Sequence, residues 1–181
     1  PGSRKQEIQS SMPIFERLSI EMPEVNFIVA GVSEWKEEYA NYMIPVLFDK
    51  TYQVLHGAQA AIVTSGTATL ETALLNIPQL VVYKTDWLFY SLAKLLVKIK
   101  YISLVNIILD RAAVPELIQQ KFSVAYLIKG LHEIMPNASK ERIQQLKDYQ
   151  ELRTCIGENG ASRTTAFKIV ESTRKFKLSN S

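Results

Sequence analysis

The residues best suited to chemistry in this sequence form a short turn between an apolar run and a helical segment. Residues 60–64 are typical of a buried parallel strand. Residues 69–75 predict a helix that stops before Pro78. A strand that runs through residues 65–67 into a helix leaves backbone N–H groups free, and such groups bind anions, most often phosphate. The turn is therefore a candidate phosphate site.

Each residue of this turn has an expected part in holding a ligand. The Ser65 hydroxyl is expected to cap the helix, and Gly66 to let a ligand approach the backbone closely. Residue 68 is Ala, so no Glu closes a capping box that would compete for the N–H donors. Glu71 lies four residues after Thr67 on the same helical face, where its carboxylate can accept hydrogen bonds from a ribose diol. The alternative is a purely structural cap, with Glu71 favoured by the helix dipole alone.

Composition narrows the class of protein. The chain has 181 residues, of which 47% are hydrophobic and 22% charged, as in a soluble globular domain. A net charge of +3 with scattered Lys and Arg does not indicate nucleic acid, but an anionic ligand or a membrane surface fits it. The single Cys155 excludes an intrachain disulfide. His56 and His132 lack ligand-spaced partners, so neither a metal site nor a cofactor is expected.

Strand and helix patterns alternate along the chain. Helices are predicted at 5–21, 51–58 and 87–98, strands at 25–31, 44–48 and 80–83, an apolar segment at 102–109, and helices from Val114 onward with breaks near 136–137 and 157–160. The alternation predicts an α/β fold, a Rossmann-like parallel sheet with flanking helices, and a ligand site at the carboxyl ends of the strands. Residues 1–4 read as a loop after a strand, so the chain is expected to be a fragment cut just after one.

Five stretches together carry a family resemblance. They are residues 1–8, 61–71, 92–98, 101–109 and 114–119. In this order and spacing they resemble the lipid-A-disaccharide synthases, glycosyltransferases of the two-Rossmann-domain GT-B type. The resemblance implies that residues 1–181 form the C-terminal UDP-sugar-binding domain, with a helical tail at about 137–177. The N-terminal acceptor domain, with its Asp general base, is expected to be absent. Val105 departs from the family, which typically has Pro there.

The resemblance implies a reaction and its partners. The whole enzyme would transfer 2,3-diacylglucosamine from UDP-2,3-diacylglucosamine to 2,3-diacylglucosamine 1-phosphate, with inversion, in lipid A biosynthesis. It would work in the cytoplasm of a Gram-negative bacterium, peripheral to the inner membrane, and a homodimer is a further partner to consider. Helix N–H donors and an Arg can stabilise the charge that develops on departing UDP without a metal. The fragment alone is expected to be inactive and to hold no catalytic residue.

The resemblance also assigns the site, residue by residue. Arg4 would pair with the diphosphate. Asn106 would lie near the donor sugar or phosphates, or serve only as a turn residue. Glu116 is not assigned to the donor site, because Glu after Pro is typical of any helix start. Trp87 and Phe89 are open to acyl chains or lipid. The full donor set is Ser3, Arg4, Ser65, Gly66 and Thr67 at the phosphates, Glu71 at the ribose, the backbone of Phe48 and Asp49 at uracil, and Asn106.

Two other functions compete with this one. A UDP-N-acetylglucosamine epimerase or the peptidoglycan N-acetylglucosaminyltransferase shares this half-fold, but their phosphate turns tend towards Ser-Gly-Gly or Ser-Gly-Ala. A non-catalytic nucleotide-binding or scaffolding module is the alternative of another class. Stabilisation of the chain by UDP would favour any of the glycosyltransferase-fold enzymes over the scaffold.

Overall fold

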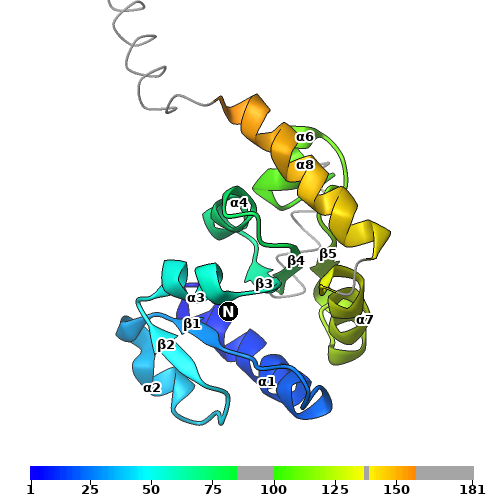
Figure 1. Ribbon diagram of the computed structural model, residues 1–181. Helices are drawn as coiled ribbons and strands as arrows, with labels where there is room; N and C mark the ends of the chain where they lie inside the picture. Colours follow the sequence, from blue (N-terminus) through cyan, green and yellow to red (C-terminus); the bar gives the residue numbers. More distant parts are fainter. Residues whose placement is uncertain (85–99, 137–138, 158–181) are drawn as a thin grey trace, which may run out of the picture.

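Helices and parallel strands alternate along the part of the chain that the structure describes. A computed structural model describes residues 1–84, 100–136 and 139–157 (Figure 1). In chain order the elements are α1 (Lys5–Glu21), β1 (Val29–Gly31), η1 (Ser33–Trp35), α2 (Lys36–Tyr39), β2 (Val46–Phe48), α3 (Thr51–Gly57), β3 (Ala61–Thr64), α4 (Thr67–Leu74), β4 (Gln79–Tyr83), α6 (Leu104–Leu109), β5 (Glu116–Ile118), η2 (Gln119–Lys121), α7 (Val124–Ile134) and α8 (Lys140–Ile156). The predicted α/β fold with parallel sheets and flanking helices is confirmed.

The described strands form two sheets rather than one. The first has the order β1-β2, with Val29 beside Val46 and Gly31 beside Phe48. The second has the order β3-β4-β5, and all pairings in both are parallel. Figure 1 shows the first sheet with α2 and α3, and the second near α4, α6, α7 and α8.

Strand β5 corrects the prediction that only helices follow Val114. Residues 116–118 pair with β4, and the Val81 N–H donates to the Pro115 carbonyl. A Pro followed by Glu is a local helix-start signal, but the open edge of β4 satisfies these backbone groups by tertiary pairing. Long-range pairing therefore decides the conformation of this segment.

Strand β4 is the centre of the core because its two faces pack against different helices. Leu80 and Val82 join a cluster that includes Ile8, Met12, Phe15 and Leu18 of α1, the predicted apolar face of that helix. Val81 packs on the opposite side with residues of α4, α6 and α8. A Cβ added to Gly130 of α7 would lie 2.8 Å from a Leu80 methyl carbon, so α7 approaches β4 closely.

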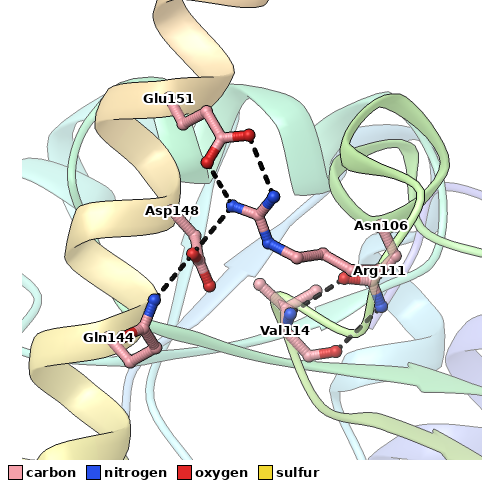
Figure 2. Close-up of polar contacts among 6 residues, drawn as sticks. All are labelled: Asn106, Arg111, Val114, Gln144, Asp148 and Glu151. Atoms are coloured by element: carbon pink, nitrogen blue, oxygen red, sulfur yellow. Dashed lines mark hydrogen bonds and ion pairs between the residues drawn. The ribbon is translucent and has the colours of Figure 1, made fainter.

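The last described helix, α8, is held by polar contacts that range from buried to exposed. The Gln145 side chain accepts from the Gln79 backbone N–H at 2.5 Å and donates to its carbonyl at 3.2 Å. Figure 2 shows the Arg111 guanidinium reaching Asp148 and Glu151 of α8, at 2.9 Å and 2.5 Å. The hydrogen bond from Arg111 lowers the pKa of Glu151 below its ordinary value. This helix lies within residues 137–177, and the helical tail as a whole stays a prediction. The predicted helix at 87–98, with Trp87 and Phe89, lies outside the described residues.

Candidate functional site

The turn before α4 differs in one detail from the sequence prediction. Helix α4 begins at Thr67, two residues earlier than expected, and Gly66 is its N-cap. The prediction that Ser65 caps the helix is therefore wrong: its hydroxyl instead donates to the Ile102 carbonyl at 2.8 Å. The Thr69 hydroxyl donates to the Gly66 carbonyl at 2.7 Å. Ser65 thus ties the turn to the segment that precedes α6.

The backbone of this turn remains open to a ligand. Within the described ranges, no hydrogen bond is made by the N–H groups of Gly66, Thr67 and Ala68. A Cβ added to Gly66 would meet no atom within 4 Å, so the space above it is empty. Free N–H groups at the start of a helix attract an anion through hydrogen bonding and the helix dipole. The turn keeps the features of the phosphate site that its sequence predicts.

The turn before α1 also leads into a helix, but its backbone N–H groups bond to a carboxylate of the chain itself. Glu7 Oε2 accepts from the N–H groups of Ser3 and Arg4, at 3.1 Å and 3.2 Å. Gly2 has a φ of +97°, and a Cβ there would lie 2.8 Å from Glu7 Cβ, which explains why a side chain does not fit. The Arg4 guanidinium is 3.8 Å from the other Glu7 oxygen, and its side chain is 83% exposed. Arg4 is therefore free to turn toward a ligand.

The two turns and Glu71 line one cavity. It has a volume of about 1060 Å³. Six of the nine predicted donor-site residues border it, namely Ser3, Arg4, Ser65, Gly66, Thr67 and Glu71. The cavity also extends between β1 and β3. Two turns that are 62 positions apart in the sequence therefore border one cavity, and the second of them follows the carboxyl end of β3, where ligands bind on parallel sheets.

A residue that sequence reasoning missed contacts Glu71. The hydroxyl of Tyr52, on α3, hydrogen-bonds with the Glu71 carboxylate, and this contact raises the pKa of Tyr52 above its ordinary value. Tyr52 is 57% exposed. The two residues lie on different helices, so no local pattern in the sequence relates them. The contact gives the Glu71 carboxylate, which borders the cavity, a partner within the protein.

Phe48 and Asp49 lie apart from this cavity's lining. The Phe48 ring packs against Tyr39, with ring centroids 5.5 Å apart. The Asp49 N–H donates to the Gly31 carbonyl at 3.0 Å, and its carboxylate accepts from the Ser33 N–H at 3.1 Å. Hydrogen bonds from Ser33 lower the pKa of Asp49. Their backbone contact with uracil stays a prediction.

Asn106 is buried and has a structural role. Its side-chain amide donates to the Val114 carbonyl at 2.9 Å and to Glu116 at 2.8 Å, and its oxygen accepts from the Val114 N–H at 2.8 Å (Figure 2 shows the contacts with Val114). The residue is only 1% exposed. These contacts fit the turn-residue alternative, and a contact with the donor sugar or phosphates stays a prediction.

Glu116 was not predicted as a site residue, but its side chain holds the turn before α6. Its carboxylate accepts from the N–H groups of Ile102 and Ser103, at 3.1 Å and 2.9 Å, as well as from Asn106. Since Glu116 lies in β5 and not at a helix start, its charge serves the turn before α6. No nearby residue in the sequence signals this pairing, because its backbone partners are 13 and 14 positions away.

Two further observations concern metals and membranes. In residues 1–84, 100–136 and 139–157, no three His, Cys, Asp or Glu side chains lie where they could hold a metal ion together. None of the helices in these ranges has the length and apolar character needed to cross a bilayer.

The comparison with known proteins identifies the family. A profile of the family described as Lipid-A-disaccharide synthetase matches residues 1–169. The chain belongs to this family. It is similar to proteins named lipid-A-disaccharide synthase from Anaeromyxobacter dehalogenans strain 2CP-C (32% identity over 182 residues), Nitrosococcus oceani (33% over 177) and Psychromonas ingrahamii (34% over 176).

The alignments also show how much of each relative this chain corresponds to. The three alignments cover 94%, 92% and 90% of this chain, but only 47%, 45% and 46% of the relatives. The chain thus spans about half the length of these family members. The parallel sheets with flanking helices agree with a Rossmann-like half of a GT-B glycosyltransferase, as lipid-A-disaccharide synthetases are.

Proposed function

We propose that residues 1–181 form the C-terminal UDP-sugar-binding domain of a lipid A biosynthesis glycosyltransferase. The observation that carries this proposal is the meeting of two helix-start turns, Arg4 and Glu71 on one cavity, in a chain of the lipid-A-disaccharide synthetase family. The whole enzyme transfers 2,3-diacylglucosamine from UDP-2,3-diacylglucosamine to 2,3-diacylglucosamine 1-phosphate. The names of the relatives support a disaccharide product.

The diphosphate binds where donors and positive charge converge. The free N–H groups at the start of α4 take phosphate oxygens, and the exposed Arg4 guanidinium adds a charge-assisted contact. Both become more favourable as the anomeric bond breaks, because negative charge then develops on the departing UDP. Ser3 and Ser65 lie at the edges of the same cavity and can add hydroxyl contacts.

The ribose binds at Glu71. Its carboxylate borders the cavity one helical turn beyond the free N–H groups, which suits a nucleotide that spans both. The hydrogen bond from Tyr52 occupies part of the carboxylate, and a carboxylate has lone pairs for further donors. The ribose diol thus joins an arrangement that is already oriented. The uracil ring then extends toward the Phe48–Asp49 loop.

The acceptor hydroxyl is deprotonated by a group that this chain does not contain. The acceptor oxygen forms the new bond to the anomeric carbon from the face opposite to UDP, and a base outside residues 1–181 takes its proton. Orientation of the two substrates and exclusion of water require a second domain that closes on this one. The domain alone therefore binds UDP without transferring sugar. The lipid-linked substrates place the whole enzyme at the cytoplasmic face of the inner membrane, and a homodimer remains a prediction.

A binding experiment tests the proposal. Isothermal titration of residues 1–181 with UDP should show one site, and Glu71→Ala should weaken it about 10- to 100-fold, because a charged acceptor contributes about 1.5–3 kcal/mol. Glu37→Ala, an exposed Glu of α2 that does not border the cavity, is the matched control.

Two outcomes would contradict the proposal. Absence of UDP binding by the folded chain would favour a scaffold. Unchanged affinity in folded Glu71→Ala would remove the ribose role. A donor series of UDP-N-acetylglucosamine and UDP-2,3-diacylglucosamine separates the competing enzymes, since a lipid A enzyme should prefer the acylated donor.

A further inference from the structure

The peptide group that joins Ser3 to Arg4 has a hydrogen-bond partner on each side. The Trp35 indole N–H donates to the Ser3 carbonyl oxygen at 3.1 Å. The Arg4 N–H of the same peptide donates to Glu7 Oε2 at 3.2 Å. This peptide is trans, and a trans peptide is planar, with its C=O and N–H pointing in opposite directions. The contact with Trp35 therefore also fixes the direction of the Arg4 N–H.

The two partners of this peptide lie in different surroundings. Ser3, Arg4 and Glu7 border the cavity, whereas Trp35 does not. Trp35 lines a smaller pocket beside α2, together with residues that include Lys5. The Ser3 carbonyl is thus directed at a residue outside the cavity, and the Arg4 N–H at a carboxylate that borders it. Rotation of this peptide by half a turn would exchange the donor for a carbonyl oxygen, which repels a phosphate.

The Trp35 side chain is held by contacts from both α1 and the η1 segment. Lys5 Nζ lies 5.9 Å from the centre of the Trp35 ring, close enough for a cation–π attraction. The same ammonium group pairs with Glu38 Oε1 at 2.7 Å. On the other side, the Ser33 N–H donates to the Asp49 carboxylate at 3.1 Å, which fixes the start of η1. The indole N–H therefore has a defined direction.

We propose that Trp35 is a positioning residue for the donor diphosphate, an inference that rests on the proposed function of the cavity. Its indole N–H keeps the Ser3 carbonyl turned away, so that the Arg4 N–H stays a donor toward the cavity. Glu7 accepts from this N–H in the structure, and a phosphate oxygen takes the place of Glu7 in the complex. A donor that is already oriented needs no reorganisation when the anion binds. Trp35 itself does not contact the nucleotide.

A contact that only attached α1 to η1 would have different consequences. Its loss would lower the stability of the domain and would affect every ligand of the cavity alike. Loss of a contact that orients the Arg4 N–H affects only ligands with a phosphate. The comparison of UDP with uridine therefore separates the two roles.

Trp35→Phe is the test variant, because it removes the indole N–H and keeps an aromatic ring beside Lys5. Isothermal titration should show an affinity for UDP that is about 3- to 10-fold lower, the range that corresponds to one hydrogen bond. The affinity for uridine should change by less than about twofold, since uridine has no phosphate. Tyr126→Phe, at an exposed position of α7 that does not border the cavity, is the matched control and should change neither affinity.

A second measurement needs no nucleotide. Amide exchange at the Arg4 N–H, followed by NMR in the chain without ligand, should be at least about threefold faster in Trp35→Phe than in the wild type, because the peptide opens more often. The Ile8 N–H donates to the Arg4 carbonyl at 3.1 Å within α1 and serves as the internal reference. Its exchange should not change.

The possible failures can be told apart. Unchanged exchange at the Arg4 N–H in Trp35→Phe overturns the proposal, whatever the chain binds. Equal losses of affinity for UDP and uridine also overturn it, because they indicate a contact that only supports the fold. UDP binding that Trp35→Phe leaves unchanged contradicts this inference alone, whereas a folded wild-type chain that binds no UDP contradicts the proposed function.

Discussion

Replacing Glu116 with Ala should destabilise the fold although this residue touches neither turn of the cavity. The change removes the acceptor for the N–H groups of Ile102 and Ser103 and for the Asn106 amide. Asn106 keeps its two bonds to Val114, whereas the two backbone donors lose the partner that they have in the structure.

The expected loss in the free energy of unfolding depends on the hydrogen bonds that the substitution removes. Hydrogen bonds to a charged group contribute about 1.5–3 kcal/mol, and an unsatisfied buried donor costs about 1–3 kcal/mol. The contacts are half-buried, so water can replace part of them. We expect a loss of roughly 2–3 kcal/mol, or a fall of about 4–12 °C in the thermal midpoint. Glu116→Gln keeps an oxygen acceptor and should cost about half as much.

Urea denaturation followed by circular dichroism measures the free energy of unfolding. Glu24→Ala, an exposed Glu without a side-chain contact in the described structure, is the control and should change stability by less than about 0.5 kcal/mol. A loss for Glu116→Ala as small as that of the control would refute the reasoning. UDP titration of the same variant provides a second readout. Because Ser65 donates to the Ile102 carbonyl, loosening residue 102 should also weaken UDP binding.

Two further predictions concern the cavity and the activity of residues 1–181. Arg4→Ala should weaken the binding of UDP more than that of uridine, because only UDP has the charge that Arg4 contacts. Arg17→Ala, on the far part of α1, should change the affinity for neither ligand. Equal losses of affinity for both ligands would show that Arg4 does not contact the diphosphate. Residues 1–181 mixed with labelled UDP-2,3-diacylglucosamine and acceptor should yield no disaccharide, and measurable transfer would show that the base lies within this sequence.

The sequence predicts best where local pattern and tertiary packing agree. Helix α1 has its predicted bounds, because an apolar face repeats along 5–21 and packs on the core. The sequence patterns fail where residues distant in the sequence determine the local conformation. The segment at 116–118 pairs with β4. The Ser65 hydroxyl donates to the Ile102 carbonyl, and the Tyr52 side chain on α3 contacts Glu71 on α4. Each of these contacts joins residues that are not neighbours on one helix or strand, so periodicity and capping rules carry no information about them.

The carboxylate of Glu7 makes ligand entry at α1 an exchange of one anion for another. Before a ligand arrives, Glu7 already neutralises the Ser3 and Arg4 donors. A phosphate that takes these donors must displace the carboxylate, whereas at α4 it meets open N–H groups. Binding therefore changes the local charge less than a count of basic residues suggests, and its dependence on ionic strength should be shallow. The turn before α1 is therefore poorly suited to small inorganic anions, which lack the remaining contacts of a nucleotide and cannot compensate for moving Glu7.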